Sequence, residues 1–153
     1  PPALSADGRY VAFGSAASNL TVGDTNGRGD VFVRDLVAGT TTLVSVATDG
    51  TQGNGSGSSP AISADGRYVA FDSAATNLTV GDTNGRDDVF VRDRVAGTTT
   101  RVSVATDGAQ GNNSSYGLAI SADGRYVAFD SGASNLTVDD TNNKIDVFVH
   151  RYR

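Results

Sequence analysis

Side chains that carry oxygen ligands recur in one loop, which the chain contains three times. Each copy places Asp, Asn and Asp at its first, third and seventh positions, and an apolar run follows. Ca²⁺ binds about 6 to 8 oxygens, and loops rich in carboxylates and amides supply them. The spacing therefore predicts candidate calcium ligands at Asp24, Asn26, Asp30, Asp82, Asn84, Asp88, Asp140, Asn142 and Asp146.

A basic residue in each copy of the loop argues against a metal. The segment resembles the Asp-x-Asn-x-Asp-Gly-x-x-Asp calcium loop of integrin-type propeller blades, but it is shorter by two residues. Arg28, Arg86 and Lys144 stand where that loop has an oxygen ligand, and a cation there repels a metal unless its side chain points away. The alternative is a set of Asx-turns, in which the Asp and Asn side chains accept from nearby backbone N–H groups.

The remaining polar motifs do not predict catalysis. His150 is the only histidine, and it occupies a position that Arg34 and Arg92 fill in the other copies, which indicates a scaffold role. A Ser-His-acid triad is therefore not expected. Three Asp-Gly pairs are interpreted as turns between two strands rather than as catalytic carboxylates: Asp7-Gly8, Asp65-Gly66 and Asp123-Gly124.

Two further motifs also occur once in each copy. Arg9, Arg67 and Arg125 each precede a Tyr; the pair would form a ligand fork if it lined a central channel, and a solvated hairpin charge is the alternative that we favour. An Asn-Leu-Thr sequence matches the N-glycosylation pattern, but we expect its leucine to anchor the long loop under the sheet. These leucines are Leu20, Leu78 and Leu136.

All of these motifs belong to one repeating unit. Ser-Ala-Asp-Gly-Arg-Tyr-Val-Ala-Phe occurs three times at a constant spacing, and the first two repeats differ at 11 of 58 aligned positions, so that 47 are identical. Repeats of this size gain stability by stacking on their neighbours. The repeat therefore divides the chain into a first unit at residues 1–59, a second at 60–117 and an incomplete third at 118–153.

One unit reads as four antiparallel strands. In the second unit we expect a short strand at 59–63, a hairpin at the Asp-Gly pair, strands at 68–73 and 88–93 around a polar loop, and a last strand at 98–105. No segment shows helical periodicity, so no helix is expected. The prediction is an all-β protein of β-propeller blades; a β-solenoid is the rival, but its parallel strands do not need a hairpin in each unit.

At these residues the chain resembles a known family. Ser63 to Phe71 followed by Asp88 to Asp93 is similar to the WD-like repeat of TolB-type β-propellers, whose blades carry a Ser-Pro-Asp-Gly turn and a strand that opens with Asp. The resemblance covers essentially the whole chain and implies the fold. It does not assign an activity, because such propellers serve as assembly factors, peptidase lids and extracellular modules.

The composition narrows the class of partner. The net charge is −5, and 12 basic residues are spread singly among 17 acidic ones, so nucleic acid is not an expected partner. Cysteine is absent, which excludes disulfides and thiolate metal sites. No apolar run is long enough to span a bilayer. We expect an extracellular or periplasmic location, with no secretion signal in this chain.

The third unit is predicted to stop after its third strand, at 145–152, which leaves an open arc with apolar faces at both ends. A closed ring needs about 4 to 8 blades. We therefore expect these faces to be covered by other copies of the chain, as a ring or a filament, or by the rest of a longer propeller.

The predicted function is a noncatalytic binding or scaffold module for protein, glycan or self-assembly. The alternatives are a subunit that polymerises edge to edge and a fragment of a propeller glycosidase or lyase.

Overall fold

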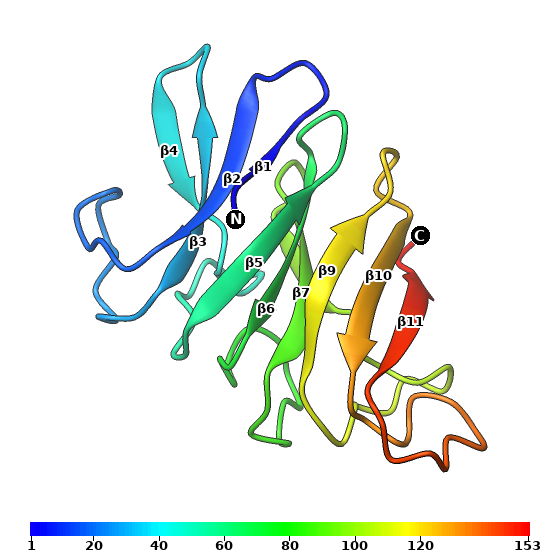
Figure 1. Cartoon of the computed structure of the whole chain (residues 1–153). Coiled ribbons are helices and arrows are strands. Elements are labelled where there is room, and N and C mark those ends of the chain that lie inside the picture. Colours follow the sequence, from blue (N-terminus) through cyan, green and yellow to red (C-terminus); the bar gives the residue numbers. More distant parts are fainter.

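Three antiparallel sheets make up the molecule. The computed structural model describes all 153 residues and contains eleven β-strands and no helix. Figure 1 shows the sheets side by side in chain order. The first two have four strands each and the third has three. The strands are β1 (Ala3–Leu4), β2 (Tyr10–Ser15), β3 (Asp30–Asp35), β4 (Thr40–Leu43), β5 (Gly57–Ile62), β6 (Tyr68–Ser73), β7 (Asp88–Asp93), β8 (Thr98–Arg101), β9 (Ser115–Ile120), β10 (Tyr126–Ser131) and β11 (Asp146–Arg151).

The sheets have the strand order of propeller blades. β1-β2-β3-β4 and β5-β6-β7-β8 pair in sequence order, and β9-β10-β11 repeats the first three positions. β6 is buried along its whole length, as its apolar residues on both faces predict. Phe71 lies opposite Phe90 in the β6–β7 ladder, with the two rings stacked 5.8 Å apart. The predicted all-β propeller architecture is confirmed, and so is the prediction that no helix forms.

The first and last strands of a blade differ from the prediction. β5 starts at Gly57 instead of Ser59, and its pairing with β6 shifts register between Ser58 and Ala61. This irregularity places Pro60, which has no N–H to donate, where the ladder is already interrupted. β8 ends at Arg101 rather than at residue 105, because the chain then turns back and pairs Val104 with Gln110 in an isolated bridge.

The core lies between blades rather than within one blade. One cluster joins blades 1 and 2 and an equivalent cluster joins blades 2 and 3. Neither blade could bury these side chains alone, as expected for stacked repeats. The first cluster contains Ala12, Val31, Val33 and Val44 from blade 1 with Val69, Phe71, Ala75, Leu78 and Phe90 from blade 2.

The Asp-Gly hairpins also link neighbouring blades. Gly66 has a φ of 72°, and a Cβ there would lie 2.1 Å from the Tyr10 ring of blade 1. The glycine is therefore required twice, by its left-handed backbone and by the ring packed against it. The backbone N–H of Ala6 donates to the Ala64 carbonyl, and that of Ala64 donates to the Ala122 carbonyl, both at 2.9 Å.

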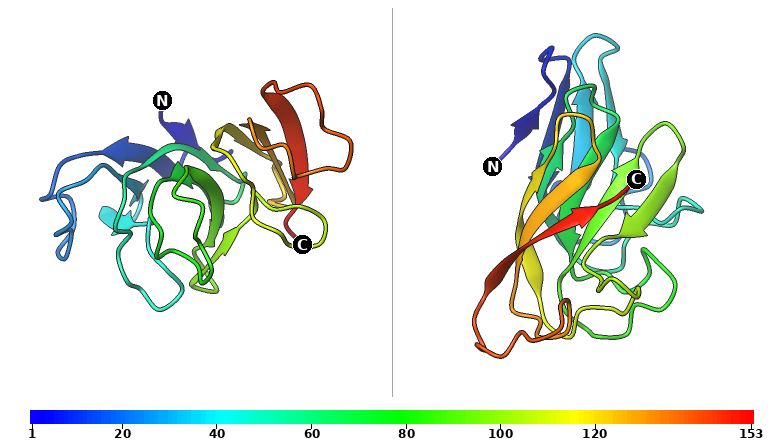
Figure 2. Two further views of the ribbon diagram at one scale, coloured as in Figure 1. Left: turned by 90° about the horizontal axis from the view of Figure 1, so that it is seen from below. Right: turned by 90° about the vertical axis from the view of Figure 1, so that its right-hand side faces the viewer.

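The chain begins in the first blade of the row and ends in the last one (Figure 2). The third sheet lacks the strand that β4 and β8 supply in the others, so β11 is an open edge. In Figure 1 the long loops β2–β3, β6–β7 and β10–β11 follow one edge of the molecule, from its left side through the bottom to the lower right, and we call this edge the loop rim. No helix capable of crossing a membrane is present.

Candidate functional site

The acidic loop of blade 1 is held by a glutamine from the segment after β4. Gln52 Nε2 donates to Asp24 Oδ1 (2.9 Å) and to Asp30 Oδ2 (3.1 Å), and Ser45 Oγ donates to Asp30 Oδ1 (2.6 Å). Asp30 is fully buried and Asp24 is 7% exposed. The Asp24 Oδ2 atom is buried without a hydrogen-bond partner. Two carboxylates thus share one amide donor, and no cationic side chain pairs with either of them.

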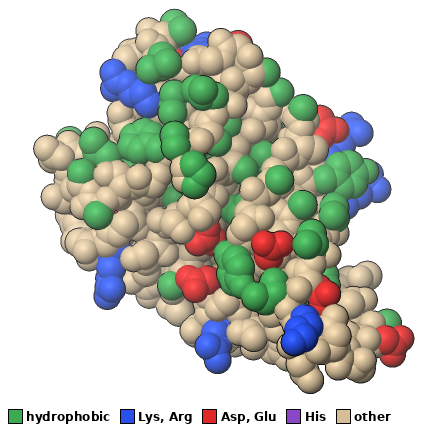
Figure 3. Space-filling view, viewed as in Figure 1, with side chains coloured by type: hydrophobic (Ala, Val, Ile, Leu, Met, Phe, Trp, Pro, Cys, Tyr) green, Lys and Arg blue, Asp and Glu red, His purple; other side chains and the backbone are tan.

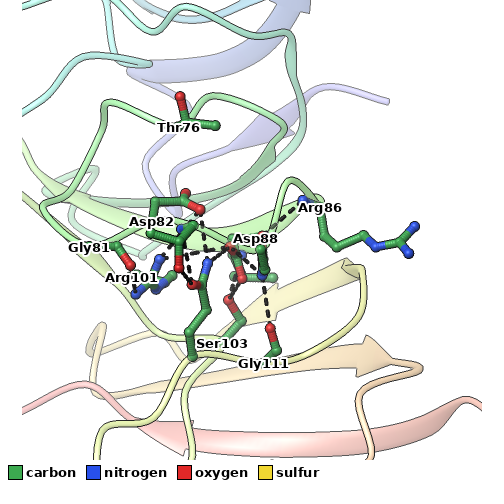
Figure 4. A network of polar contacts seen from close by, with 12 residues as sticks. Thr76, Gly81, Asp82, Arg86, Asp88, Arg101, Ser103 and Gly111 are labelled. Carbon is green, nitrogen blue, oxygen red and sulfur yellow. Dashed lines mark hydrogen bonds and ion pairs between the residues drawn. The ribbon is translucent and has the colours of Figure 1, made fainter.

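Blade 2 repeats this network and adds a cation (Figure 4). Gln110 Nε2 donates to Asp82 Oδ1 (2.8 Å) and to Asp88 Oδ2 (2.9 Å). Arg101 Nη1 lies 3.6 Å from Asp82 Oδ1 and 3.9 Å from Asp88 Oδ2. The corresponding residue of blade 1 is Leu43.

The titration of Asp82 reflects these opposing influences. Burial raises the pKa of the Asp82 carboxyl, and the nearby charge of Asp88 also raises it. The hydrogen bond from Gln110 and the positive charge of Arg101 act in the other direction. The negative charges are therefore held in place by donors and a cation that the fold itself supplies.

The third copy of the loop is open to solvent. Asn142 Nδ2 donates to both carboxylate oxygens of Asp146, at 3.2 and 2.9 Å. Asp140 lies in the same loop and is partly exposed. The three copies of the loop therefore differ. Blade 1 has two buried carboxylates without an ion pair, blade 2 adds Arg101 to the equivalent carboxylates, and blade 3 has an exposed loop.

The asparagine of each loop forms the predicted Asx-turn. Asn26 Oδ1 accepts from the backbone N–H of Arg28 at 2.7 Å, and the same bond recurs in the other loops. Asn26 Nδ2 also donates to the carbonyl of Gly53. No group of three or more His, Cys, Asp or Glu side chains has the arrangement of a metal site. Calcium binding at the nine residues stays a prediction. An unpaired carboxylate oxygen is present in both blades, as Asp24 Oδ2 and Asp82 Oδ2, but only blade 1 has Leu43 in place of the repelling Arg101, so blade 1 is the better place for a metal.

Sequence reasoning placed the carboxylates and the asparagines but missed their partners. Ser45, Gln52 and Arg101 come from segments that looked like a strand end or a plain linker. The available signal was repetition, because the same Ser and Gln recur in the second repeat as Ser103 and Gln110. Arg101 carries no such signal, since it is one of the differences between the repeats.

The hairpin arginines form ion pairs instead of lining a channel. Arg9 binds both carboxylate oxygens of Asp35, at 3.0 and 2.7 Å, and Arg67 binds Asp93 in the same way. Each guanidinium also lies over the Tyr that follows it, 4.9 Å from the ring centre. The predicted solvated charge was therefore only half right: these arginines are partly exposed, but they are paired. Blade 3 has Arg151 at the position of Asp93, and Arg125 instead lies near Asp123.

His150 lies in β11, where its ring is partly buried, and this burial lowers its pKa. It pairs across the ladder with Val127 and has no acid or nucleophile as a hydrogen-bond partner.

The leucine anchors behave as predicted in two copies, where Leu78 and Leu136 are buried in the clusters between blades. Leu20 is only partly buried, because no blade of this chain packs behind it.

Two equivalent grooves open on the loop rim, one at each boundary between blades. The first, with a volume of about 670 Å³, lies between residues 47–49 and residues 76–81. The second, of about 560 Å³, lies between residues 105–107 and residues 135–138. Val80 and Val138 line the two grooves and are 102% and 86% exposed. We call these the rim grooves.

The rim grooves are polar except for small aliphatic side chains. Thr48 and Asp49 line the first groove, and Thr106 and Asp107 stand at the same places in the second. The Thr48 hydroxyl also accepts from the backbone N–H of Thr99 at 3.0 Å, which fixes one wall of the first groove. The face seen in Figure 3 carries small groups of hydrophobic side chains between scattered single charges, and no broad basic patch.

Comparison with known proteins identifies the fold. No family model matches the sequence, and no curated protein matches it. Among solved structures, the chain is similar to TolB from Acinetobacter baumannii (19% identity, TM-score 0.56, 99% of this chain and 29% of that one) and to a putative TolB from Agrobacterium tumefaciens (17%, 0.61, 99% and 46%). It is also similar to the β-propeller domain of the Trilobed protease from Pyrococcus furiosus (15%, 0.52, 99% and 42%).

These likenesses concern the arrangement of strands. The chain spans less than half the length of each of these three relatives, and the identities lie between 15% and 19%. The relatives include both TolB proteins and a protease domain, so the fold does not select an activity. With its strand order, hairpins and interblade cores, the chain has the TolB-type β-propeller fold.

Proposed function

We propose that the chain is a noncatalytic binding module that uses the rim grooves as equivalent sites for an extended polypeptide. The observation that carries this proposal is the pair of grooves that open at successive blade boundaries, each with a highly exposed valine. Single exposed apolar residues need no explanation, but here each valine borders a groove at a blade boundary, where it can contact a ligand that enters the groove. Equivalent sites at a fixed spacing suit a ligand that binds at several points at once.

The lining of the grooves favours a peptide over a sugar. Thr, Asn and Asp side chains offer hydrogen bonds, and Val, Leu and Ala offer small apolar contacts. No aromatic ring lines either groove, so a sugar would find no flat face to pack against. Asp49 and Asp107 are exposed at the two sites, and hydrogen bonds from Thr51 lower the pKa of Asp49. A basic peptide with small apolar side chains therefore fits best.

The absence of catalysis is part of the proposal and rests on how the acidic residues are used. In blades 1 and 2 the buried carboxylates accept hydrogen bonds from Gln and Ser of the same repeat. A glycosidase or lyase would need a free acid pair facing a substrate cavity. Such a pair would also have to distinguish one blade from the others, whereas these networks repeat.

An immobilised library of basic and acidic peptides tests the proposal. The 153-residue chain is expected to bind basic peptides, with an affinity that falls as salt is added because the attraction is electrostatic. Changing Val80 and Val138 together to Ser should weaken binding at least tenfold, because both apolar contacts disappear. Linking two copies of the best peptide should strengthen binding further in the wild type.

The matched control is Val37→Ser, an equally simple change of an exposed valine in the β3–β4 turn, outside both grooves. It should leave binding unchanged. Binding that survives the double change, or that appears on a glycan array and not on peptides, would overturn the choice of site or of ligand. Cleavage of the bound peptide, followed by mass spectrometry, would show that the module is an enzyme.

A further inference from the structure

The contact between neighbouring blades is the same at both boundaries of the chain. Each blade presents a forward face to the next blade, and the next blade presents a rear face to it. The first boundary uses the residues at the equivalent places one repeat earlier. At the second boundary the forward face of blade 2 includes Tyr68, Ala70, Val89, Val91 and Val102, and the rear face of blade 3 meets it with Val127, Phe129, Ala133, Leu136 and Phe148.

The forward face of blade 3 has no partner within the chain. Val147 and Val149, which correspond to the fully buried Val89 and Val91, are exposed. Tyr126 is 45% exposed, whereas its equivalent Tyr68 is 2% exposed. Figure 1 shows β11 at the free end of the row of blades. These side chains form an apolar surface equivalent to the forward faces that are buried at the two internal boundaries.

The rear face of blade 1 is the matching half of this contact. Leu4 and Leu36 are exposed, although Ile62, which corresponds to Leu4, packs against the first interblade cluster. Val11 and Phe13 are only partly buried, whereas their equivalents in blade 2 are fully buried.

The packing of a tyrosine on a hairpin glycine is the most specific contact between blades, and one half of it is found at each end of the row. Tyr10 packs on Gly66 and Tyr68 packs on Gly124, so closely that a Cβ added to either glycine would fall 2.1 or 2.3 Å from the ring. Tyr126 has no glycine to pack on, and Gly8 has nothing within 4 Å. The tyrosine and the glycine that would complete a third such contact therefore lie at opposite ends of the molecule.

The backbone shows the same complementarity. Ala6 donates to Ala64 and Ala64 donates to Ala122, so each hairpin is tied to the next. Within the chain, the N–H of Ala122 and the carbonyl of Ala6 have no such bond. A donor is left at one end and an acceptor at the other.

We propose that the forward face of blade 3 binds the rear face of blade 1 of a second copy of this chain, which continues the interblade contact from one molecule to the next. The contact is head to tail, so it closes into a ring only if the rotation per copy divides a full turn, and otherwise extends as a filament. Leu36 of the second copy stands where Arg94 covers Tyr10 at the first boundary, so an apolar contact replaces a cation over the ring.

Sedimentation velocity over a range of chain concentrations tests the proposal. The mass of the wild type should rise with concentration. Tyr126→Asp should abolish binding through the forward face, and Leu4→Asp should abolish binding through the rear face, because each places a charge in an apolar contact. Each variant alone should stay monomeric at concentrations at least tenfold above the wild-type transition, while an equimolar mixture should form a dimer and nothing larger, since each pair retains one intact forward and one intact rear face.

The controls separate association from folding. All substituted side chains are exposed, and circular dichroism should show the wild-type β spectrum for each; Val149→Asp is a second forward-face variant if Tyr126→Asp is unfolded. Val37→Asp, in the β3–β4 turn, should associate like the wild type. A wild type that stays monomeric at several hundred micromolar, a mixture that does not dimerise, or a Leu4→Asp variant that dimerises alone would each overturn the proposal.

Discussion

Blades 1 and 2 have nearly the same sequence, and yet they stabilise the same pair of buried carboxylates in different ways. Both use one glutamine and one serine as donors, at closely similar distances. Only blade 2 adds a guanidinium, from Arg101, where blade 1 has Leu43. The repeated backbone fixes the position of the donors, while single substitutions decide the charge that surrounds them.

The two blades also differ in what lies behind them. Blade 2 has a blade on either side, whereas the rear face of blade 1 is open. Equivalent residues therefore have unequal environments, and the same substitution in each blade separates the local cost of a change from the cost of the interblade contact.

The largest expected effect is that of Gly66→Ala. Both Gly66 and Gly8 have positive φ, so alanine costs about 1 kcal/mol of backbone strain at either position. At Gly66 the new Cβ would also overlap the Tyr10 ring, which adds about 2 kcal/mol of overpacking. Urea unfolding at low protein concentration should thus show Gly66→Ala to be less stable than Gly8→Ala by about 2 kcal/mol. Equal losses would mean that the tyrosine does not pack on the glycine.

Arg101→Leu, which converts blade 2 to the residue of blade 1, ranks second. The change leaves the buried Asp82 and Asp88 without a cation, and breaking a buried charge pair is expected to cost about 2 to 3 kcal/mol here, because the distances of 3.6 and 3.9 Å are long for an ion pair. The reciprocal Leu43→Arg should be neutral or stabilising by up to about 1 kcal/mol. Chemical unfolding of both variants measures the contrast, and a stable Arg101→Leu protein would show that Gln110 and Ser103 suffice.

Acid should weaken the hairpin ion pairs of blades 1 and 2. The hydrogen bond from Arg67 lowers the pKa of Asp93 from 3.8 to about 2, and the pKa of Asp35 is lowered by Arg9 in the same way. A carboxyl whose pKa is depressed by folding stabilises the protein above its unfolded pKa, and this contribution disappears as the pH falls from about 4 to about 2.

Asp93→Asn isolates the contribution of blade 2. The difference in unfolding free energy between the wild type and this variant should shrink over that pH range, as followed by urea titrations at several pH values. Arg151→Asn in blade 3, at the position equivalent to Asp93, should show no such loss, because no carboxylate stands there. A pH-independent difference for Asp93→Asn would indicate that the carboxylate is not paired in solution.

The sequence was sufficient to predict the central strands of each blade. β6 and β7 begin and end where the pattern placed them, because each is a short run of apolar and β-branched residues whose limits are marked by turn residues on both sides. The outer strands were less certain for a physical reason. Their limits depend on an irregularity at Ser59 and on the turn after Val102, both of which are set by contacts with other parts of the blade.

The candidate site was only half predictable. The Asp and Asn residues could be found because their spacing is local, but Gln52 and Ser45 reach them from across the blade. A contact between residues so far apart in the chain leaves no trace in local periodicity. The rim grooves were not predicted either, since they require the loop of one blade and the linker of the previous blade to be placed together.

The smallest expected effect concerns calcium, which remains a proposal for blade 1 alone. Asp24 and Asp30 form no ion pair, whereas Arg101 lies close to both carboxylates of blade 2 and disfavours a metal there. Calcium at ten times its dissociation constant would stabilise the fold by about 1.4 kcal/mol and raise the melting temperature by roughly 3 to 5 °C. Leu43→Arg should abolish this shift, because its guanidinium would occupy the place of the ion. Arg101→Leu should enlarge it by opening a second site. If the melting temperature of the wild type is the same in calcium and in chelator, the calcium proposal is wrong, and Gln52 is the only partner that the two carboxylates share.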